Sequence, residues 1–504
     1  MIKRPRNFLA ACLLCLAGCA VGPDYRTPDI QMPDKFVAAD FAAPQKAAKD
    51  KRPVIDAALW WRGLKDPELD ALIERAVRDN PDIAQAVDRM QESRAQEEVV
   101  LGHALPDVSG SVGAGAGTGS DLARGRAAQS LVSGEDTGGL QQVTHVEGFD
   151  AAWQLDLFGQ YRREMEQASA DTQAAIAARN GVLISVIADV ARAYIDMRAA
   201  QMQSGVLQKN IDIAQDYVKL TKERFARGIT NEYDVALAQR QLDSLHAQTM
   251  PLAAKIHAAQ YVIATLLGQF PETMSHELDK PALIPVVPAA IDGGVPIDLL
   301  RRRPDIVEAD REAAAASAGI GVAEADLFPH VSLTGAAGYQ GGVGLHSATP
   351  GFIWSVGPSV DWALLDFGAL DAKVDIADFQ AKASLINYKK TVLNAVREVD
   401  TAMDAYKARQ DQLNDLGEAL AASQRAVDLA TQRYARGLTD SLNVIDAERQ
   451  DYEIESEYVA ARRQAAEQFV ALYKALGGGW EKNQSFPALP RPQPAVVAAL
   501  SRLF

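Results

Sequence analysis

Few side chains in this 504-residue sequence are spaced for catalysis or for binding a cofactor. None of its seven histidines lies in an H-E-x-x-H pattern, which would place two zinc ligands on one helix face. The glycine-rich run at 113–119 lacks the lysine and hydroxyl residue of a phosphate-binding loop, and it lacks G-x-G-x-x-G spacing. We therefore expect no catalytic residue, no metal site and no cofactor, and we interpret the chain as a protein that is not an enzyme.

Cys19 is the cysteine whose sequence context predicts a defined reaction of its thiol. Lys3, Arg4 and Arg6 precede a short apolar run, as in a secretory signal peptide, and the run is too short to span a bilayer. It ends in Leu-Ala-Gly-Cys, which resembles a bacterial lipobox and predicts cleavage before Cys19. Acylation of the Cys19 thiol and of the new amino group would then anchor the chain in a membrane. Several acyl chains on one residue bind a membrane far more strongly than a single chain does. The alternative is an ordinary secretory signal that happens to contain Cys19.

Two further cysteines, Cys12 and Cys15, leave with the signal peptide, so the mature chain has no disulfide. Ala20 stands where an inner-membrane retention signal would place aspartate, which favours the outer membrane. The net charge of −15 argues against nucleic acid as a partner, because binding to phosphate needs a basic surface. No run of about 18 apolar residues occurs, so we expect no transmembrane helix.

The first half of the sequence recurs in the second half. NPDI at 80–83 returns as RPDI, and LPDVS at 105–109 returns as FPHVS, both displaced by 223 positions. LDLFG at 155–159 returns as LLDFG, and RFARGIT at 224–230 returns as RYARGLT, both displaced by 209. A period this long exceeds the roughly 20–50 residues of a solenoid unit. It predicts two copies of one large structural unit.

Each copy contains a proline-free stretch with helical spacing of apolar residues, from about Gln160 to Phe225 in the first. A helix of that length spans about 100 Å, which suits a coiled-coil rod or the wall of a tube. A second helix is expected to return over 231–267 and over 441–476. The apolar stripe that joins the helices survives in both copies: Leu183, Ile187, Val190, Tyr194, Met197, Leu207, Ile211, Ala214, Val218, Thr221 and Phe225, and the residues 209 positions later.

Before each long helix lies a stretch with the alternation of β-strands. We expect strands over 108–117 and 148–159 in the first copy, and over 331–342 and 352–368 in the second. Strands of about ten residues can cross a bilayer when tilted. Four strands cannot close a barrel, and open edges cannot face lipid, so the barrel would have to be shared between chains. Three chains would supply twelve strands.

These features resemble the TolC-type outer-membrane efflux proteins, in the lipoprotein branch that serves RND-type pumps. The resemblance covers nearly the whole mature chain and rests on CAVGPDY after the lipobox, ALWWRGLKDPELDALIERAVRDNPDIAQA at 58–86, LLRRRPDIVEADREAAAASAGIGVAEADLFPHVSL at 299–333, and the paired R-[FY]-A-R-G motifs.

The fold implied by the resemblance is mainly α with β and internally duplicated. It combines a long α-helical barrel, a 12-stranded transmembrane β-barrel in a homotrimer and a mixed equatorial belt, where Trp60 and Trp61 would pack. The expected parts are 1–18 signal peptide, 19–104 lipidated segment, belt and first short helices, 105–159 first β-hairpin, 160–270 first helical hairpin, 271–327 belt linker and second-copy short helices, 328–368 second β-hairpin, 369–479 second helical hairpin, and 480–504 belt tail.

The function implied is that of a passive exit duct. Such a protein is anchored in the lipid of the bacterial outer membrane, extends into the periplasm, and receives substrate from an inner-membrane RND-type transporter through a periplasmic adaptor protein. One alternative is the outer-membrane duct of an ATP-driven type I protein secretion system, which the lipobox disfavours. Another is a non-conducting coiled-coil scaffold, which the strand hairpins disfavour.

The resemblance also assigns two sets of site residues. Acidic and apolar residues ring the periplasmic constriction of such proteins; here the matching positions are Asp446 and Leu442, while Asn443 stands where some members carry a second aspartate. The alternative is that Asp446 is a solvated helix residue paired with Arg449. The helix tips would contact the adaptor through Arg227, Gly228, Arg436 and Gly437, although the glycines would end the helices in either case.

Overall fold

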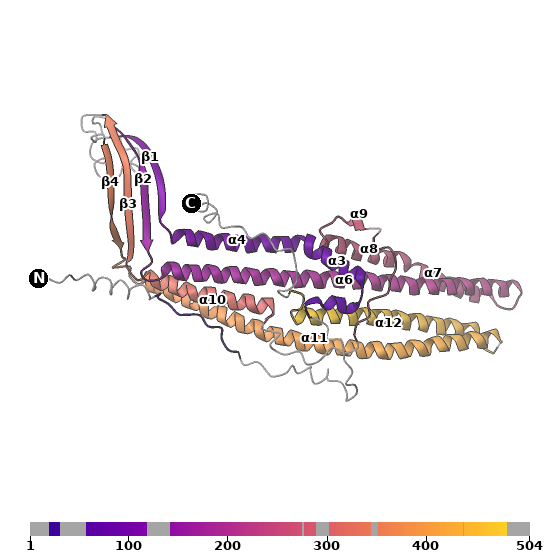
Figure 1. Ribbon diagram of the computed structural model, residues 1–504. Coiled ribbons are helices and arrows are strands. Elements are labelled where there is room, and N and C mark those ends of the chain that lie inside the picture. Colours follow the sequence, from indigo (N-terminus) through magenta and orange to yellow (C-terminus); the bar gives the residue numbers. More distant parts are fainter. Residues whose placement is uncertain are drawn as a thin grey trace.

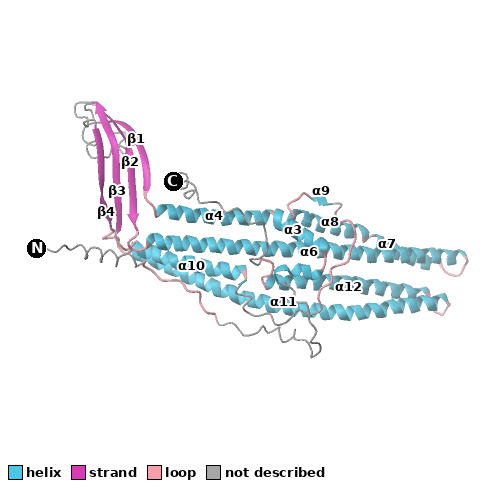
Figure 2. Cartoon of the chain, viewed as in Figure 1, coloured by secondary structure: helices cyan, strands magenta, loops and turns pink. Residues whose placement is uncertain are grey.

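The computed structural model describes residues 20–30, 57–117, 142–274, 277–288, 302–343, 351–436 and 438–480. The chain is elongated, with a four-stranded sheet at one end and the tips of two helical hairpins at the other (Figure 1). Long helices run between these ends and make up most of the described chain (Figure 2). The signal peptide, Cys19, Gly437 and the tail from 481 lie outside the described residues.

The expected duplication is confirmed in the element boundaries. The long helices α6 (Gln160–Ala226) and α11 (Ala369–Ala435) have 67 residues each and are displaced by 209 positions. The shorter helices α4 (Pro81–His103) and α10 (Pro304–Ala325) begin 223 positions apart. Each long helix therefore spans about 100 Å, as the sequence predicts.

The returning helix of the first copy differs from the expectation of one helix over 231–267. It consists of α7 (Glu232–His246) and α8 (Thr249–Leu266), separated at Ala247 and Gln248. Pro251 explains the break, because it has no N–H to donate to the carbonyl of Ala247 four residues earlier. In the second copy the equivalent position is Ala460, and α12 (Ser441–Ala475) is continuous.

The predicted apolar stripe of α6 is buried from Leu183 to Thr221. Phe225 is the exception, since it lies in the last turn and is exposed. In α11 the equivalent stripe is buried or nearly so from Val392 to Tyr406, but from Leu416 to Tyr434 it is only half-buried in the single chain. By length and composition, α6 contains a stretch that could cross a membrane; more than half of that stretch is buried inside the protein, as in a core helix.

A compact belt surrounds the middle of α6. It includes the 3₁₀ segment η1 (Ala57–Leu64), α3 (Pro67–Asp79) and the short α9 (Pro271–Met274). Trp60 and Trp61 are both buried here; the Trp60 ring stacks on Tyr473 with centroids 5.8 Å apart and meets Phe469 edge-on. These contacts are consistent with the packing role that the sequence suggests for the two tryptophans.

The sheet consists of β1 (Asp107–Gly117), β2 (Gln142–Leu155), β3 (His330–Val343) and β4 (Gly351–Asp361). All neighbours pair antiparallel in the order β1-β2-β3-β4, which leaves β1 and β4 as the edges. The fourth strand ends at Asp361 rather than at 368 as predicted. The chain bends there toward Phe367, whose positive φ of 55° is incompatible with a strand.

One face of the sheet is richer in apolar side chains than the other. In β4 the exposed side chains of Phe352, Trp354, Val356 and Val360 alternate with Ser355, Gly357 and Ser359, while Ile353 is the apolar residue on the second face. Successive side chains of a strand point to opposite faces, so those four exposed apolar residues share one face. Such a sheet suits lipid on one side and water on the other.

Candidate functional site

Both hairpin tips close their long helices with the equivalent backbone hydrogen bond. After α6, Gly228 adopts φ of +74°, and the N–H of Ile229 donates to the Arg224 carbonyl over 3.0 Å. After α11, the N–H of Leu438 makes the equivalent bond of 2.9 Å to Arg433. Glycine adopts a positive φ more easily than other residues, so the need to end the helix is enough to explain Gly228. Gly437 lies outside the described residues.

Arg227 and Arg436 are the last residues before these turns, and both side chains are exposed. Neither side chain is needed for the turn, because only its backbone N–H bonds to the preceding carbonyls. The two hairpin tips lie at the same end of the molecule (Figure 1), so these exposed side chains are available to a partner there.

The two tips also contact each other, which the sequence alone did not predict. The guanidinium carbon of Arg224 lies 4.7 Å from the ring centroid of Tyr434, in a cation–π contact. These residues belong to the repeated R-[FY]-A-R-G motif, one from each copy. The signal that could have identified the contact was the recurrence of an arginine–aromatic pair in both motifs.

The predicted gate residues lie in the first two turns of α12, directly after the second tip. Asp440 caps this helix by accepting the N–H of Leu442 at 3.1 Å. Leu442 is 58% exposed, and the Asn443 amide donates to the Thr439 hydroxyl over 2.8 Å. Asp446 lies one turn further and is also exposed. With spacings of three and four residues, Leu442, Asn443 and Asp446 share one side of the helix.

Asp446 accepts hydrogen bonds from Arg449 at 3.1 Å and from Gln450 at 3.4 Å. Both side chains of the ion pair are more than half exposed, and such surface pairs contribute under about 1 kcal/mol. The Asp446–Arg449 pair that the alternative hypothesis requires is thus present within one chain. It is weak enough for Asp446 to exchange Arg449 for another partner. The gate role of Asp446 stays a prediction.

Glu448 is a titratable neighbour of this stretch that sequence reasoning missed. It lies in a small recess with Tyr217, Leu245 and Ile445, and burial raises the pKa of its carboxyl to about 7. Near neutral pH the Glu448 carboxyl is therefore partly protonated, whereas the carboxyl of an exposed glutamate is ionised.

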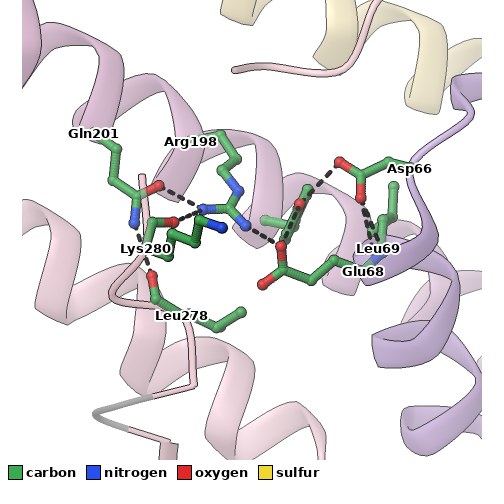
Figure 3. Close-up of polar contacts among 8 residues, drawn as sticks. Asp66, Glu68, Leu69, Arg198, Gln201, Leu278 and Lys280 are labelled. Atoms are coloured by element: carbon green, nitrogen blue, oxygen red, sulfur yellow. Dashed lines mark hydrogen bonds and ion pairs between the residues drawn. The ribbon is translucent and has the colours of Figure 1, made fainter. Parts of the chain in front are cut away.

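At the belt, a buried arginine joins α6 to two other segments (Figure 3). Arg198 is 1% exposed; it donates to the Gln201 side chain over 2.7 Å, to the Lys280 carbonyl over 2.8 Å, and to the Glu68 carboxylate. Its guanidinium carbon also lies 4.8 Å from the ring centroid of Tyr194. Gln201 in turn donates to the Leu278 carbonyl, so this cluster fixes α3 and the segment after α9 onto α6.

In each copy, equivalent residues of different type join the short helix to the end of the returning helix. The Asn80 amide, at the start of α4, donates over 2.7 Å to the carbonyl of Leu266, the last residue of α8. Arg303 precedes α10 and donates over 2.6 Å to the carbonyl of Ala475, the last residue of α12. Arg303 is also hydrogen-bonded to Glu398 on α11. Each tie closes one helical hairpin onto its short helix.

The segment that follows Cys19 is clamped at the base of the sheet. Arg163, in the first turn of α6, donates over 2.9 Å to the carbonyls of both Val21 and Gly22. Gly22 has φ of +90°, and a Cβ there would lie 2.4 Å from the Cα of Gly321. The Val21 N–H donates to the Phe158 carbonyl over 3.1 Å. The chain next to Cys19 is therefore held where strand β2 joins α6.

Comparison with known proteins agrees with this geometry. The family model described as outer membrane efflux protein matches residues 72–269 and 295–478. Nodulation protein T of Rhizobium leguminosarum bv. trifolii is 31% identical over 93% of this chain and 96% of its own length. The toluene efflux pump outer membrane protein TtgC of Pseudomonas putida is 29% identical over 94% of this chain and 95% of its own.

A solved structure of the outer-membrane channel OprN superposes with a TM-score of 0.80 at 35% identity. The match covers 92% of this chain and 100% of that one. The helices, the sheet and their connections are therefore those of an outer-membrane channel.

Proposed function

The chain belongs to the family of outer membrane efflux proteins, and we propose that it is a passive exit duct fed by an inner-membrane RND-type pump through a periplasmic adaptor. It is an efflux channel of the outer membrane that extends into the periplasm. The pump supplies the energy and selects the substrate, while the duct provides a continuous passage.

The observation that carries this proposal is the separation of two surfaces along one rod. A sheet with an exposed apolar face lies at one end, and two exposed arginine-bearing tips lie at the other. The helices between them span about 100 Å. This arrangement supports a protein that enters lipid at the sheet and meets soluble partners at the tips.

The assembly proposed is a homotrimer. Four strands leave two open edges, and unpaired backbone groups are unstable in lipid. Three chains would close twelve strands into a barrel, while the helices of the three chains would form the tube below it. No enzyme activity is part of this proposal, because transport through a duct needs none.

We also propose that Cys19 carries lipid. The lipobox supports this, and so does the clamp on Val21 and Gly22, because it holds the neighbouring residues beside the base of the apolar sheet. Acyl chains on Cys19 would there enter the same membrane as the strands. The lipid anchor also favours an RND-type system over type I protein secretion.

Conductance of the purified protein in a planar bilayer tests the duct. We expect stable trimers in detergent and discrete channel openings after reconstitution. Trimers that insert but pass no current would favour the scaffold alternative. Restored drug resistance in a strain that lacks only its RND-linked channel, without restored protein secretion, would separate the RND system from type I secretion.

Arg436→Glu should weaken adaptor docking, because it reverses an exposed charge at the tip without removing a turn contact. We expect at least a several-fold loss of adaptor affinity and higher drug sensitivity, with normal trimer yield. Arg62→Glu is the matched control, since Arg62 is also exposed but lies in the belt. Resistance equal to that of the unmodified protein in cells carrying Arg436→Glu would exclude this contact.

A further inference from the structure

The side of α12 that packs on the first copy carries a glutamate close to the tip. Ile445, Glu448 and Tyr452 follow one another at spacings of three and four residues, so they share this side of the helix. Tyr452 packs against the apolar cluster of α6 and α7, and its hydroxyl donates to the Gln248 side chain over 2.8 Å. Glu448 lies one turn closer to the tip, at a position where the packing of helices favours an apolar side chain.

Glu448 lies in a recess formed by α6, α7 and α12. The walls of the recess include Ile213 and Tyr217 of α6, Leu245 of α7 and Ile445 of α12. Its free volume is about 20 Å³, which is room for about one water molecule. A carboxylate in such a place cannot keep its hydration shell, so the recess suits the protonated, neutral carboxyl.

No cation in the described part of the chain compensates a charge on Glu448. Among the described side chains that line the recess, the titratable ones are Tyr217 of α6 and Arg449 and Tyr452 of α12, whereas α7 contributes none. Arg449 pairs with Asp446 at 3.1 Å. The helix α11 also packs on α12, but none of its residues lines the recess. Burial is accordingly the cause that raises the pKa of Glu448 to about 7.

We propose that Glu448 is a pH switch in the contact between α12 and the first helical hairpin. The neutral carboxyl stays in the recess; when it releases its proton to water, the carboxylate leaves the recess to be hydrated. The first turns of α12 are then free to move away from α6 and α7. This inference rests on the proposed duct, because Leu442 and Asp446 lie within two turns of Glu448 and would move with it.

The first copy lacks this acid. The residue 209 positions before Glu448 is Gln239, whose amide donates to Asp243 over 3.0 Å and accepts from Lys222 over 3.3 Å. An amide does not ionise between pH 6 and pH 8, so this position responds to pH only in the second copy. The second copy is also the one that carries the predicted gate residues.

The direction of the response follows from the raised pKa. The contact is strongest below the ordinary pKa of 4.5, where the carboxyl is neutral both in the recess and in water. As the pH rises from 4.5 toward 7, only the hydrated carboxyl loses its proton, and the released position is increasingly favoured. Between pH 6 and pH 8 the ratio of released to packed helices should rise by up to about ten-fold per chain.

Single-channel recordings of the trimer between pH 6 and pH 8 test this response. We expect the unmodified protein to open more often as the pH rises. Glu448→Gln keeps the shape of the side chain and cannot ionise, so it should open rarely at every pH. Asp446→Asn retains Glu448 and should keep the pH response, which separates the switch from titration of the predicted gate carboxylates.

Two further glutamates of α12 provide matched controls. Burial also raises the pKa of Glu467 to about 7, but Glu467 lies 19 positions (467 − 448), or about 28 Å, further from the tip than Glu448. Glu453 lies close to Glu448 and is exposed. Glu467→Gln and Glu453→Gln should therefore both keep the pH response of the unmodified protein.

Amide hydrogen exchange over residues 441–452 measures the same movement without a current. Comparing the unmodified protein with Glu448→Gln at equal pH cancels the intrinsic pH dependence of exchange. Exchange should be faster in the unmodified protein, and the difference should grow by up to about ten-fold from pH 6 to pH 8.

Equal pH responses of the unmodified channel and of Glu448→Gln would overturn the proposed switch. So would an exchange ratio between the two proteins that is the same at pH 6 and at pH 8, and neither result would affect the duct itself. Trimers that show the expected exchange but pass no current at any pH would instead contradict the proposed function and leave the switch in place.

Discussion

Replacing Arg198 with alanine is expected to destabilise the belt by about 1.5–3 kcal/mol, the range for losing hydrogen bonds to a charged group. The guanidinium group is 1% exposed and joins the Glu68 carboxylate, the Gln201 side chain and the Lys280 carbonyl. Its loss would leave the Lys280 carbonyl and the buried Gln201 amide oxygen without this donor, and would leave a cavity beside Tyr194. We expect a lower thermal midpoint in detergent and a lower yield of trimers.

Two variants make this test specific. Arg62→Ala removes an exposed arginine from a 3.4 Å ion pair with Glu74 and should change stability by less than about 1 kcal/mol. Arg198→Lys keeps the charge but cannot reach several acceptors at once, so it should fall between alanine and the unmodified protein. If Arg198→Ala unfolds at the same temperature as Arg62→Ala, the cluster does not hold the belt together.

Replacing Asp446 with alanine is expected to reduce the cation preference of the channel several-fold. In a trimer, three Asp446 carboxylates near the three-fold axis would repel one another and attract cations. Loss of these charges should lower the cation-to-anion permeability ratio and weaken block by multivalent cations. Single-channel recordings with a salt gradient across the bilayer would measure both.

Arg449→Ala separates the gate hypothesis from the pairing hypothesis. Arg449 lies 3.1 Å from Asp446, so its removal leaves the carboxylates uncompensated and should increase cation preference, opposite to Asp446→Ala. If Asp446 is only a solvated helix residue, neither variant will change conductance or cation block. That outcome would exclude a ring of Asp446 residues at the constriction.

The architecture could be predicted from the sequence because its signals are local and are repeated. The stripe from Leu183 to Thr221 has helical spacing over many turns, and a second copy of the pattern confirms each boundary. The break at Ala247 was predictable in principle from Pro251, whose missing N–H is a property of one residue.

The belt cluster could not be predicted in the same way. Arg198 and Glu68 are 130 positions apart, and a charged residue within a helical pattern usually indicates a solvated face. Only the arrangement of η1, α3 and the segment after α9 around α6 turns that position into an interior one. The same holds for Arg163, which meets Val21 and Gly22 only because the N-terminal segment returns to the base of the sheet.

By itself, the sequence determined the lengths of the helices, the alternation of the strands and the two tip motifs, because each depends on the spacing of residues close together in the chain. It also determined the duplication, because these local patterns recur. The tertiary structure decided which copy lies against which: it placed Arg224 on Tyr434, Arg303 on Ala475 and α6 against α10. Such contacts join residues that are far apart in the chain and depend on how the helices pack, which no local pattern specifies.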